Sequence, residues 1–129
     1  MVALNENAVT LLARVTGIDA KTVAATALYT VPAGKYFVLD HIVRRTSAFT
    51  AGSKTTQAIA SFGCNDPIYD DYLDSVEYAV TMDSSFHRDS VEDTEVPVYG
   101  PGSVFKISIE TGSDADTETW DIDVFGYLI

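Results

Sequence analysis

Hydrophobic and polar residues alternate along much of this chain, which is the pattern of strands with one buried face. The stretch of residues 28–45, LYTVPAGKYFVLDHIVRR, shows the pattern most clearly and reads as strand, turn, strand. We predict a type I turn at Val31–Gly34, because proline suits the second position of such a turn and glycine the fourth. The strand that follows, Lys35–Arg45, is mainly apolar on both sides at its start and polar at its end. We therefore expect it to begin inside a two-layer core and to run out toward a rim.

Alternation predicts further strands on either side of this stretch. They are Val9–Val15 (which also fits a helical turn), Val23–Val31, Thr55–Cys64, Ser103–Glu110 and Glu118–Ile129. Turns or polar loops separate them at Thr16–Asp19, Thr46–Lys54, Gly63–Pro67, Tyr99–Gly102 and Thr111–Thr117, the last expected to be a hairpin loop. Short strands between glycine and proline turns are typical of sandwiches and barrels. We expect an all-β, single-domain antiparallel β-sandwich over residues 9–129, preceded by an N-terminal arm of residues 1–8.

The middle of the chain departs from this pattern. Residues 65–96 contain 10 of the 19 acidic residues and a single basic residue, Arg88. Apolar spacings of three and four predict one short helix or compact loop at Pro67–Val76, followed by a strand at Glu77–Met82 and an exposed loop at Asp83–Glu95. A long excursion of this kind inside a compact β domain is usually functional or bound to a partner.

Composition and charge narrow the classes of partner. A chain of 129 residues fits one core, and its net charge of −11 with only eight basic residues disfavours binding to nucleic acid or to an anionic membrane surface. The N-terminus has no secretory signal, and no segment approaches the roughly 20 apolar residues that span a bilayer. We expect a chain that is made and folded in a cytoplasm.

Residues able to support catalysis or metal binding are few. With two histidines, His41 and His87, a three-histidine metal site cannot form, and the single cysteine, Cys64, excludes an internal disulfide. Four aspartates could relieve their mutual repulsion by binding calcium, although a solvated acidic face explains them more simply; they are Asp66, Asp70, Asp71 and Asp74. An enzyme built on a pair of carboxylates stays open, since nineteen acids always supply pairs. We expect no catalytic residue, no metal and no cofactor.

Part of the chain resembles structural proteins of tailed bacteriophages. The similar segments are Ala27–Lys35 (ALYTVPAGK), Phe37–Ile42 (FVLDHI), Ile59–Asn65 (IASFGCN) and Tyr69–Tyr72 (YDDY). Phe62 and Cys64 replace the isoleucine and threonine that are more usual in this pattern, and the resemblance covers Val15–Leu73. It implies a jelly-roll-like β-sandwich without catalytic residues, which forms oligomers and binds the head or tail of the particle.

The function that this resemblance implies is a non-enzymatic virion protein, most simply a capsid decoration (cement) protein that binds across capsid subunits. Its expected partners are further copies of itself, as a trimer on local three-fold axes, and the major capsid protein or another virion protein. Tyrosines beside acids build interfaces, pack in cores or stack on sugars. The expected contact residues are Val2, Leu4, Arg44, Arg45, Tyr69, Tyr72 and Tyr78. The alternative is a glycan-binding module of a tail or head fibre that uses the same tyrosines in an exposed position.

Overall fold

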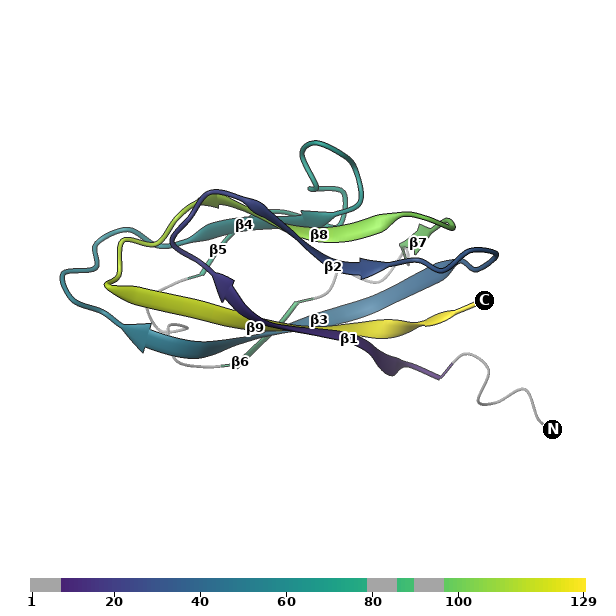
Figure 1. Cartoon of the computed structure of the whole chain (residues 1–129), viewed down its shortest axis with the longest axis horizontal. Helices are drawn as coiled ribbons and strands as arrows, with labels where there is room; N and C mark the ends of the chain where they lie inside the picture. Colours follow the sequence, from purple (N-terminus) through teal and green to yellow (C-terminus); the bar gives the residue numbers. More distant parts are fainter. Residues whose placement is uncertain (1–7, 79–85, 90–96) are drawn as a thin grey trace.

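The structure, a computed structural model, describes residues 8–78, 86–89 and 97–129, which form two antiparallel sheets packed face to face (Figure 1). The strands are β1 (Thr10–Asp19), β2 (Ala25–Thr30), β3 (Phe37–Thr50), β4 (Ile59–Gly63), β5 (Leu73–Glu77), β6 (Phe86–Asp89), β7 (Val98–Tyr99), β8 (Val104–Thr111) and β9 (Thr117–Leu128). Sheet A has the order β1-β9-β3-β6, with β7 also paired to β3, and sheet B has the order β2-β8-β4-β5. In these residues no helix is long and apolar enough to cross a membrane.

The strand order is that of a jelly roll. Eight strands remain when the two-residue β7 is set aside. Counted in chain order, strands 1, 8, 3 and 6 lie side by side in sheet A, and strands 2, 7, 4 and 5 lie side by side in sheet B. The predicted all-β, jelly-roll-like antiparallel sandwich is therefore confirmed. The hairpin expected at Thr111–Thr117 is wrong, because β8 belongs to sheet B and β9 to sheet A, so this connection crosses between the layers.

The core lies between the sheets and follows the alternation of the long strands. Strand β9 contributes Trp120, Ile122 and Val124, and all three are fully buried. Strand β8 contributes alternate residues from the facing sheet: Phe105, Ile107 and Ile109. Both inward sides agree with the alternation in the sequence, because successive side chains of a strand point to opposite faces.

A β-bulge in β3 exchanges the faces of that strand. Leu39 pairs with Gly126 and His41 pairs with Phe125, so Asp40 is an extra residue without an opposite partner. Before the bulge the odd-numbered residues Phe37 and Leu39 are buried, and after it the even-numbered residues Ile42 and Arg44 are buried. Val38, on the outer side before the bulge, is buried as well, so both sides of the strand are apolar at its start.

Three local predictions are corrected. The turn after β2 lies one residue later than expected, since Lys35 donates to the carbonyl of Pro32 (3.2 Å) and Gly34 has a φ of 74°. A positive φ at the third position defines a type II turn, which favours glycine there. The turn predicted at Thr16–Asp19 is instead the end of β1, and the polar loop predicted at Thr46–Lys54 begins with five more residues of β3.

The segment 67–76 contains no helix. Of the two predicted forms, a short helix or a compact loop, the compact loop is observed. It extends as far as Tyr72, and β5 follows it. The side-chain oxygen of Asn65 accepts bonds from the amides of Asp70 (2.7 Å) and Asp71 (3.0 Å), which holds the loop closed. The predicted exposed loop at Asp83–Glu95 contains β6, while its other residues, the end of the predicted strand at 79–82 and residues 1–7 of the arm lie outside the described residues.

Asp114 anchors the crossing between β8 and β9. Its carboxylate accepts hydrogen bonds from the amides of Thr55 and Thr56 and from the hydroxyl of Thr55, each 2.8 Å long. The bonds from Thr56 and Thr55 lower the pKa of Asp114, because they stabilise its charged form. They join the crossing to the segment that leads into β4.

We expect Gly126→Ala to destabilise the fold strongly. A Cβ atom at Gly126 would lie 2.2 Å from the carbonyl oxygen of Val38 and 2.8 Å from the ring of Phe37. Overpacking of this kind costs about 2–3 kcal/mol, which urea unfolding would measure. The control is Gly100→Ala, where the nearest atom, on the Tyr36 ring, is 3.7 Å away. Equal losses in the two variants would contradict the predicted clash.

Asp114→Ala should lower the melting temperature at pH 7, and this effect should become smaller in acid. A carboxylate with a lowered folded pKa stabilises the fold above its unfolded pKa of about 3.9, and the contribution disappears as the pH falls through the folded pKa. Thermal unfolding at neutral pH and at about pH 3 measures the difference. Asp116→Ala is the control, since the carboxylate of Asp116 accepts none of these bonds. If the melting temperature of Asp114→Ala were lowered by the same amount in acid, the charge of the Asp114 carboxylate would play no part in stability.

Candidate functional site

The outer face of sheet A is the most distinctive surface of the described residues. Directly paired residues of neighbouring antiparallel strands point to the same side, so the register shows which side chains share this face. We call it the β1–β9–β3 face and divide it into a polar half and an apolar half. The polar half consists of Arg14, Arg45, Ser47, Thr119, Asp121 and Asp123, and the apolar half of Leu11, Tyr36, Val98, Phe125, Tyr127 and Ile129.

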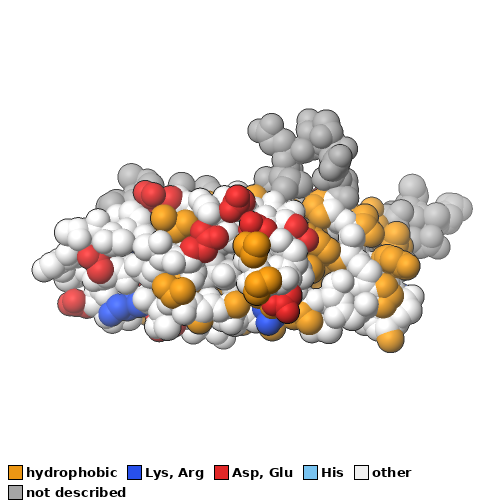
Figure 2. Space-filling model, turned by 90° about the horizontal axis from the view of Figure 1, so that it is seen from above, with side chains coloured by type: hydrophobic (Ala, Val, Ile, Leu, Met, Phe, Trp, Pro, Cys, Tyr) orange, Lys and Arg blue, Asp and Glu red, His pale blue; other side chains and the backbone are white. Residues whose placement is uncertain are grey.

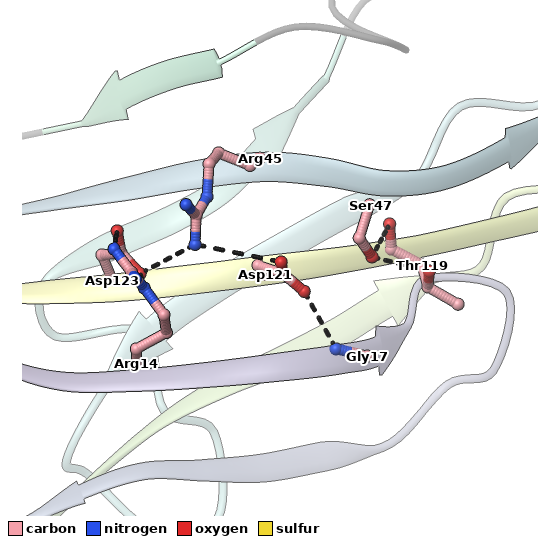
Figure 3. A network of polar contacts seen from close by, with 7 residues as sticks. All are labelled: Arg14, Gly17, Arg45, Ser47, Thr119, Asp121 and Asp123. Carbon is pink, nitrogen blue, oxygen red and sulfur yellow. Dashed lines mark hydrogen bonds and ion pairs between the residues drawn. The ribbon is translucent and has the colours of Figure 1, made fainter.

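Asp123 is the centre of the polar half (Figure 3). Arg14 of β1 donates to both of its carboxylate oxygens, through Nε at 2.8 Å and Nη2 at 3.0 Å. Arg45 of β3 donates to the same carboxylate from the other side at 3.1 Å. The side chain of Asp123 is only 6% exposed, so these charge-assisted bonds compensate for the water that it loses.

Asp121 and a pair of hydroxyls extend this network toward the far end of the strands. One oxygen of Asp121 accepts a bond from the amide of Gly17 (3.0 Å), and the other lies 3.9 Å from Arg45. The hydroxyl of Ser47 contacts both the hydroxyl (2.8 Å) and the carbonyl (3.1 Å) of Thr119 (Figure 3). The side chains thus join β1, β9 and β3 in addition to the backbone ladder.

The charges on this face are balanced. The hydrogen bond to Asp123 raises the pKa of the Arg14 guanidinium above its ordinary value. Next to the network, Arg88 of β6 lies 3.7 Å from Asp40, at the bulge of β3. Three arginines therefore face three aspartates, although the whole chain carries a net charge of −11.

The apolar half occupies the other end of the same face. The backbone groups of Tyr36 and Ile129 bond to each other in both directions at 2.9 Å, and their side chains are 51% and 56% exposed. Val38 pairs with Val98 on one side and with Tyr127 on the other, which extends the apolar row across three strands.

One row further along this half, Phe125 stacks on His41 at 4.5 Å between ring centroids and pairs with Leu11 across β1. The imidazole of His41 also contacts the carboxylate of Asp40 at 2.6 Å. This row is the boundary between the apolar half and the polar half.

Exposed hydrophobic side chains concentrate at this end of the molecule. Among the described residues, the large hydrophobic side chains in exposed positions are Val9, Leu11, Val23, Tyr36, Ile68, Val98 and Ile129. All except Val23 and Ile68 belong to segments that meet at the end formed by β7, the start of β1 and the C-terminus. Figure 2, which looks onto sheet B, also shows hydrophobic side chains gathered toward this end.

The opposite face, on sheet B, is acidic. Glu110 of β8 and the β5 residues Asp74 and Glu77 are exposed there, and red side chains are prominent in Figure 2. The amine of Lys106 lies 4.8 Å from the ring centre of Tyr69, whose loop folds over this sheet. The two outer faces therefore differ in charge, since, in the part of the chain that the structure describes, acids are paired with arginines on the β1–β9–β3 face and not on the face of sheet B.

The structure separates the residues that the sequence suggested for partner contacts. Arg45 lies on the β1–β9–β3 face, Tyr69 lies over sheet B, and Val2 and Leu4 are outside the described residues. Arg44, Tyr72 and Tyr78 are buried within the chain, and Tyr69 is only 9% exposed.

The bulge in β3 explains the burial of Arg44. It turns this side chain inward, where the guanidinium stacks 4.6 Å from the Tyr78 ring and 4.9 Å from the Trp120 ring. Tyr72 packs at right angles to Phe105 with ring centroids 5.8 Å apart. These side chains stabilise the core of a single chain.

Sequence reasoning missed Arg14, Asp123 and the apolar half of the face. Their partners come from strands more than 70 residues apart, as with Arg45 and Asp123. One signal was present: Phe125 and Tyr127 follow Asp121 and Asp123 on one side of the last strand. A strand side that is acidic at one end and aromatic at the other predicts a face with two halves.

The remaining candidate chemistry is weak in the described part of the chain. Burial and the nearby charge of Asp71 raise the pKa of the Cys64 thiol to about 12, so the thiol stays protonated at neutral pH and is a poor nucleophile. No cluster of three or more histidine, cysteine, aspartate or glutamate side chains with the geometry of a metal site occurs among these residues.

Comparison with known proteins gives a likeness in fold. No protein-family model and no curated protein matches the chain. A similar solved structure is a chain of the acidic stable capsid structure of Helicobacter pylori bacteriophage KHP30, with a TM-score of 0.59 and 11% sequence identity. The similarity covers 95% of this chain and 96% of that chain, so the two share one fold over nearly their whole lengths.

Asp123→Ala should destabilise the protein by about 2 kcal/mol, because it leaves two arginines without their shared, buried acceptor. Asp121→Ala should cost less than about 1 kcal/mol, since Asp121 is more exposed and its ion pair is long. Urea unfolding of both variants at neutral pH measures these free energies. Equal losses would show that Asp123 is not the centre of the network.

Proposed function

We propose that this protein is a non-enzymatic structural protein of a phage virion, located on the head as a capsid decoration protein. The observation that carries the proposal is the match in fold, over nearly the full length of both chains, to a chain of a phage capsid structure. The sequence resemblance to tailed-phage structural proteins supports the same class independently, because it rests on residues rather than on the fold.

The proposed action is to bind across neighbouring capsid subunits and add contact area between them. The β1–β9–β3 face suits contact with another protein chain, since apolar and aromatic side chains form its exposed end and its charges are paired within the chain. Interfaces are enriched in aromatic side chains and depleted of unpaired charge at their centres. A homotrimer on the local three-fold axes of the capsid is the assembly that we propose.

The structure removes the support that the sequence provided for the glycan-binding alternative. It depended on exposed rings at Tyr69, Tyr72 and Tyr78, and these side chains are 9%, 4% and 2% exposed. A sugar stacks on the open face of an aromatic ring, which buried tyrosines do not offer. No other observation favours that function.

The test uses phage particles purified by density gradient from a culture of the strain that encodes the chain. Mass spectrometry should find the chain in DNA-filled particles in a fixed ratio to the major capsid protein. Mild chaotrope should strip it from intact shells, and stripped particles should release DNA at a lower temperature until purified protein is added back. Absence of the chain from the particles would refute a virion role, and unchanged stability of stripped particles would refute the decoration role.

A further inference from the structure

We propose that the apolar half of the β1–β9–β3 face binds a second copy of this chain. The inference rests on the proposed function and deepens it, because it names the surface through which copies of the protein join. The chemistry of the surface identifies the partner, because this half of the face is apolar while the chain as a whole carries a net charge of −11.

Exposed apolar side chains are concentrated on this half of the face. Tyr36, Val98 and Ile129 are each more than half exposed and come from three separate segments that pair side by side. Leu11, 44% exposed, pairs with Phe125 in the next row. Contiguous exposed apolar side chains that are bordered by polar residues mark interaction surfaces.

The distribution of charge favours a second copy of the chain as the partner. Each copy has a net charge of −11, so two copies repel unless they meet where the charges are balanced. The acidic face of sheet B would bring like charges together. On the β1–β9–β3 face the arginines and aspartates compensate one another within the chain, and the apolar half carries no charged side chain. This is therefore the face on which a second acidic copy is tolerated.

The outer edge of β1, which pairs with no other described strand, is poorly shaped for joining two copies by strand addition. The ladder of β1 is interrupted by two register shifts, between Leu11 and Ala13 and between Val15 and Ile18. Bulges twist an edge strand away from the flat geometry that a further strand needs. The contact is therefore expected to involve side chains of the face and not backbone pairing at the edge.

The experiment compares the solution mass of the wild-type chain with that of Tyr36→Lys and Val98→Lys by light scattering over a range of concentrations. Lysine reduces the net negative charge, so weaker association cannot result from added repulsion. Ile68→Lys is the matched control, because Ile68 is 56% exposed but lies in the loop on the sheet B side. Circular dichroism and thermal unfolding establish that each variant is folded, and Leu11→Lys replaces either variant that is not.

We expect the wild type to self-associate, the two face variants to associate at least about tenfold more weakly, and the control to match the wild type. Raising NaCl from about 0.05 M to about 0.5 M should strengthen wild-type association, because salt screens repulsion between the acidic copies. A wild-type monomer at every concentration, or face variants with the wild-type mass, would overturn the proposal.

Outcomes for this inference and for the proposed function are distinguishable. If the chain is absent from purified particles while Tyr36→Lys loses self-association, the virion role fails and the copy-to-copy contact stands. If Tyr36→Lys keeps the wild-type mass but no longer binds stripped particles, the apolar half contacts the capsid and the inference fails.

Discussion

The bulge at Asp40 determines how the residues of β3 are divided between the core and the outer face. Uninterrupted alternation from Phe37 would send Arg45 into the core and turn Ile42 and Arg44 outward. The extra residue reverses this arrangement, so that Arg45 reaches Asp123 on the surface and the guanidinium of Arg44 contacts two aromatic rings inside. Gly126, directly opposite Leu39, leaves the space that the bulged backbone occupies. The polar half of the face depends on this one irregularity.

The interior is also polar at one end. Beyond Arg44, the amine of Lys54 pairs with buried Glu118 at 3.0 Å, and Glu118 accepts a further bond from the indole of Trp120 at 2.9 Å. Breaking one partner of a buried ion pair leaves an uncompensated charge, which is more costly than the pair itself is favourable. This end of the sandwich is thus held by directional contacts inside and outside, whereas the opposite end exposes apolar side chains. The polar groups at one end of the sandwich are therefore paired within the chain, while the apolar side chains at the other end are available for contact with another protein.

The sequence predicted the fold better than it predicted the surface. Alternation identified the long strands and the inward sides of β8 and β9, because burial between two layers imposes a period of two. The same alternation failed within β3, since a bulge adds one residue without changing the composition. Arg44, Tyr72 and Tyr78 looked like contact residues because their types are common at interfaces, but packing across the sandwich places them inside. The contacts of Arg14 and Asp123 join strands from opposite ends of the chain, and a local pattern does not show which strands become neighbours.

The position of β9 has a consequence for how the protein is made. This strand is synthesised after all the other strands of the sandwich, yet it lies between β1 and β3 in the middle of sheet A. Until β9 leaves the ribosome, the edges of β1 and β3 that it joins expose backbone groups and apolar side chains, so sheet A cannot close before β9 is made. We therefore expect sheet A to form late and slowly, as is usual when the pairings join distant parts of a chain. A nascent chain that stalls before β9 is complete would remain open to association with other unfinished chains.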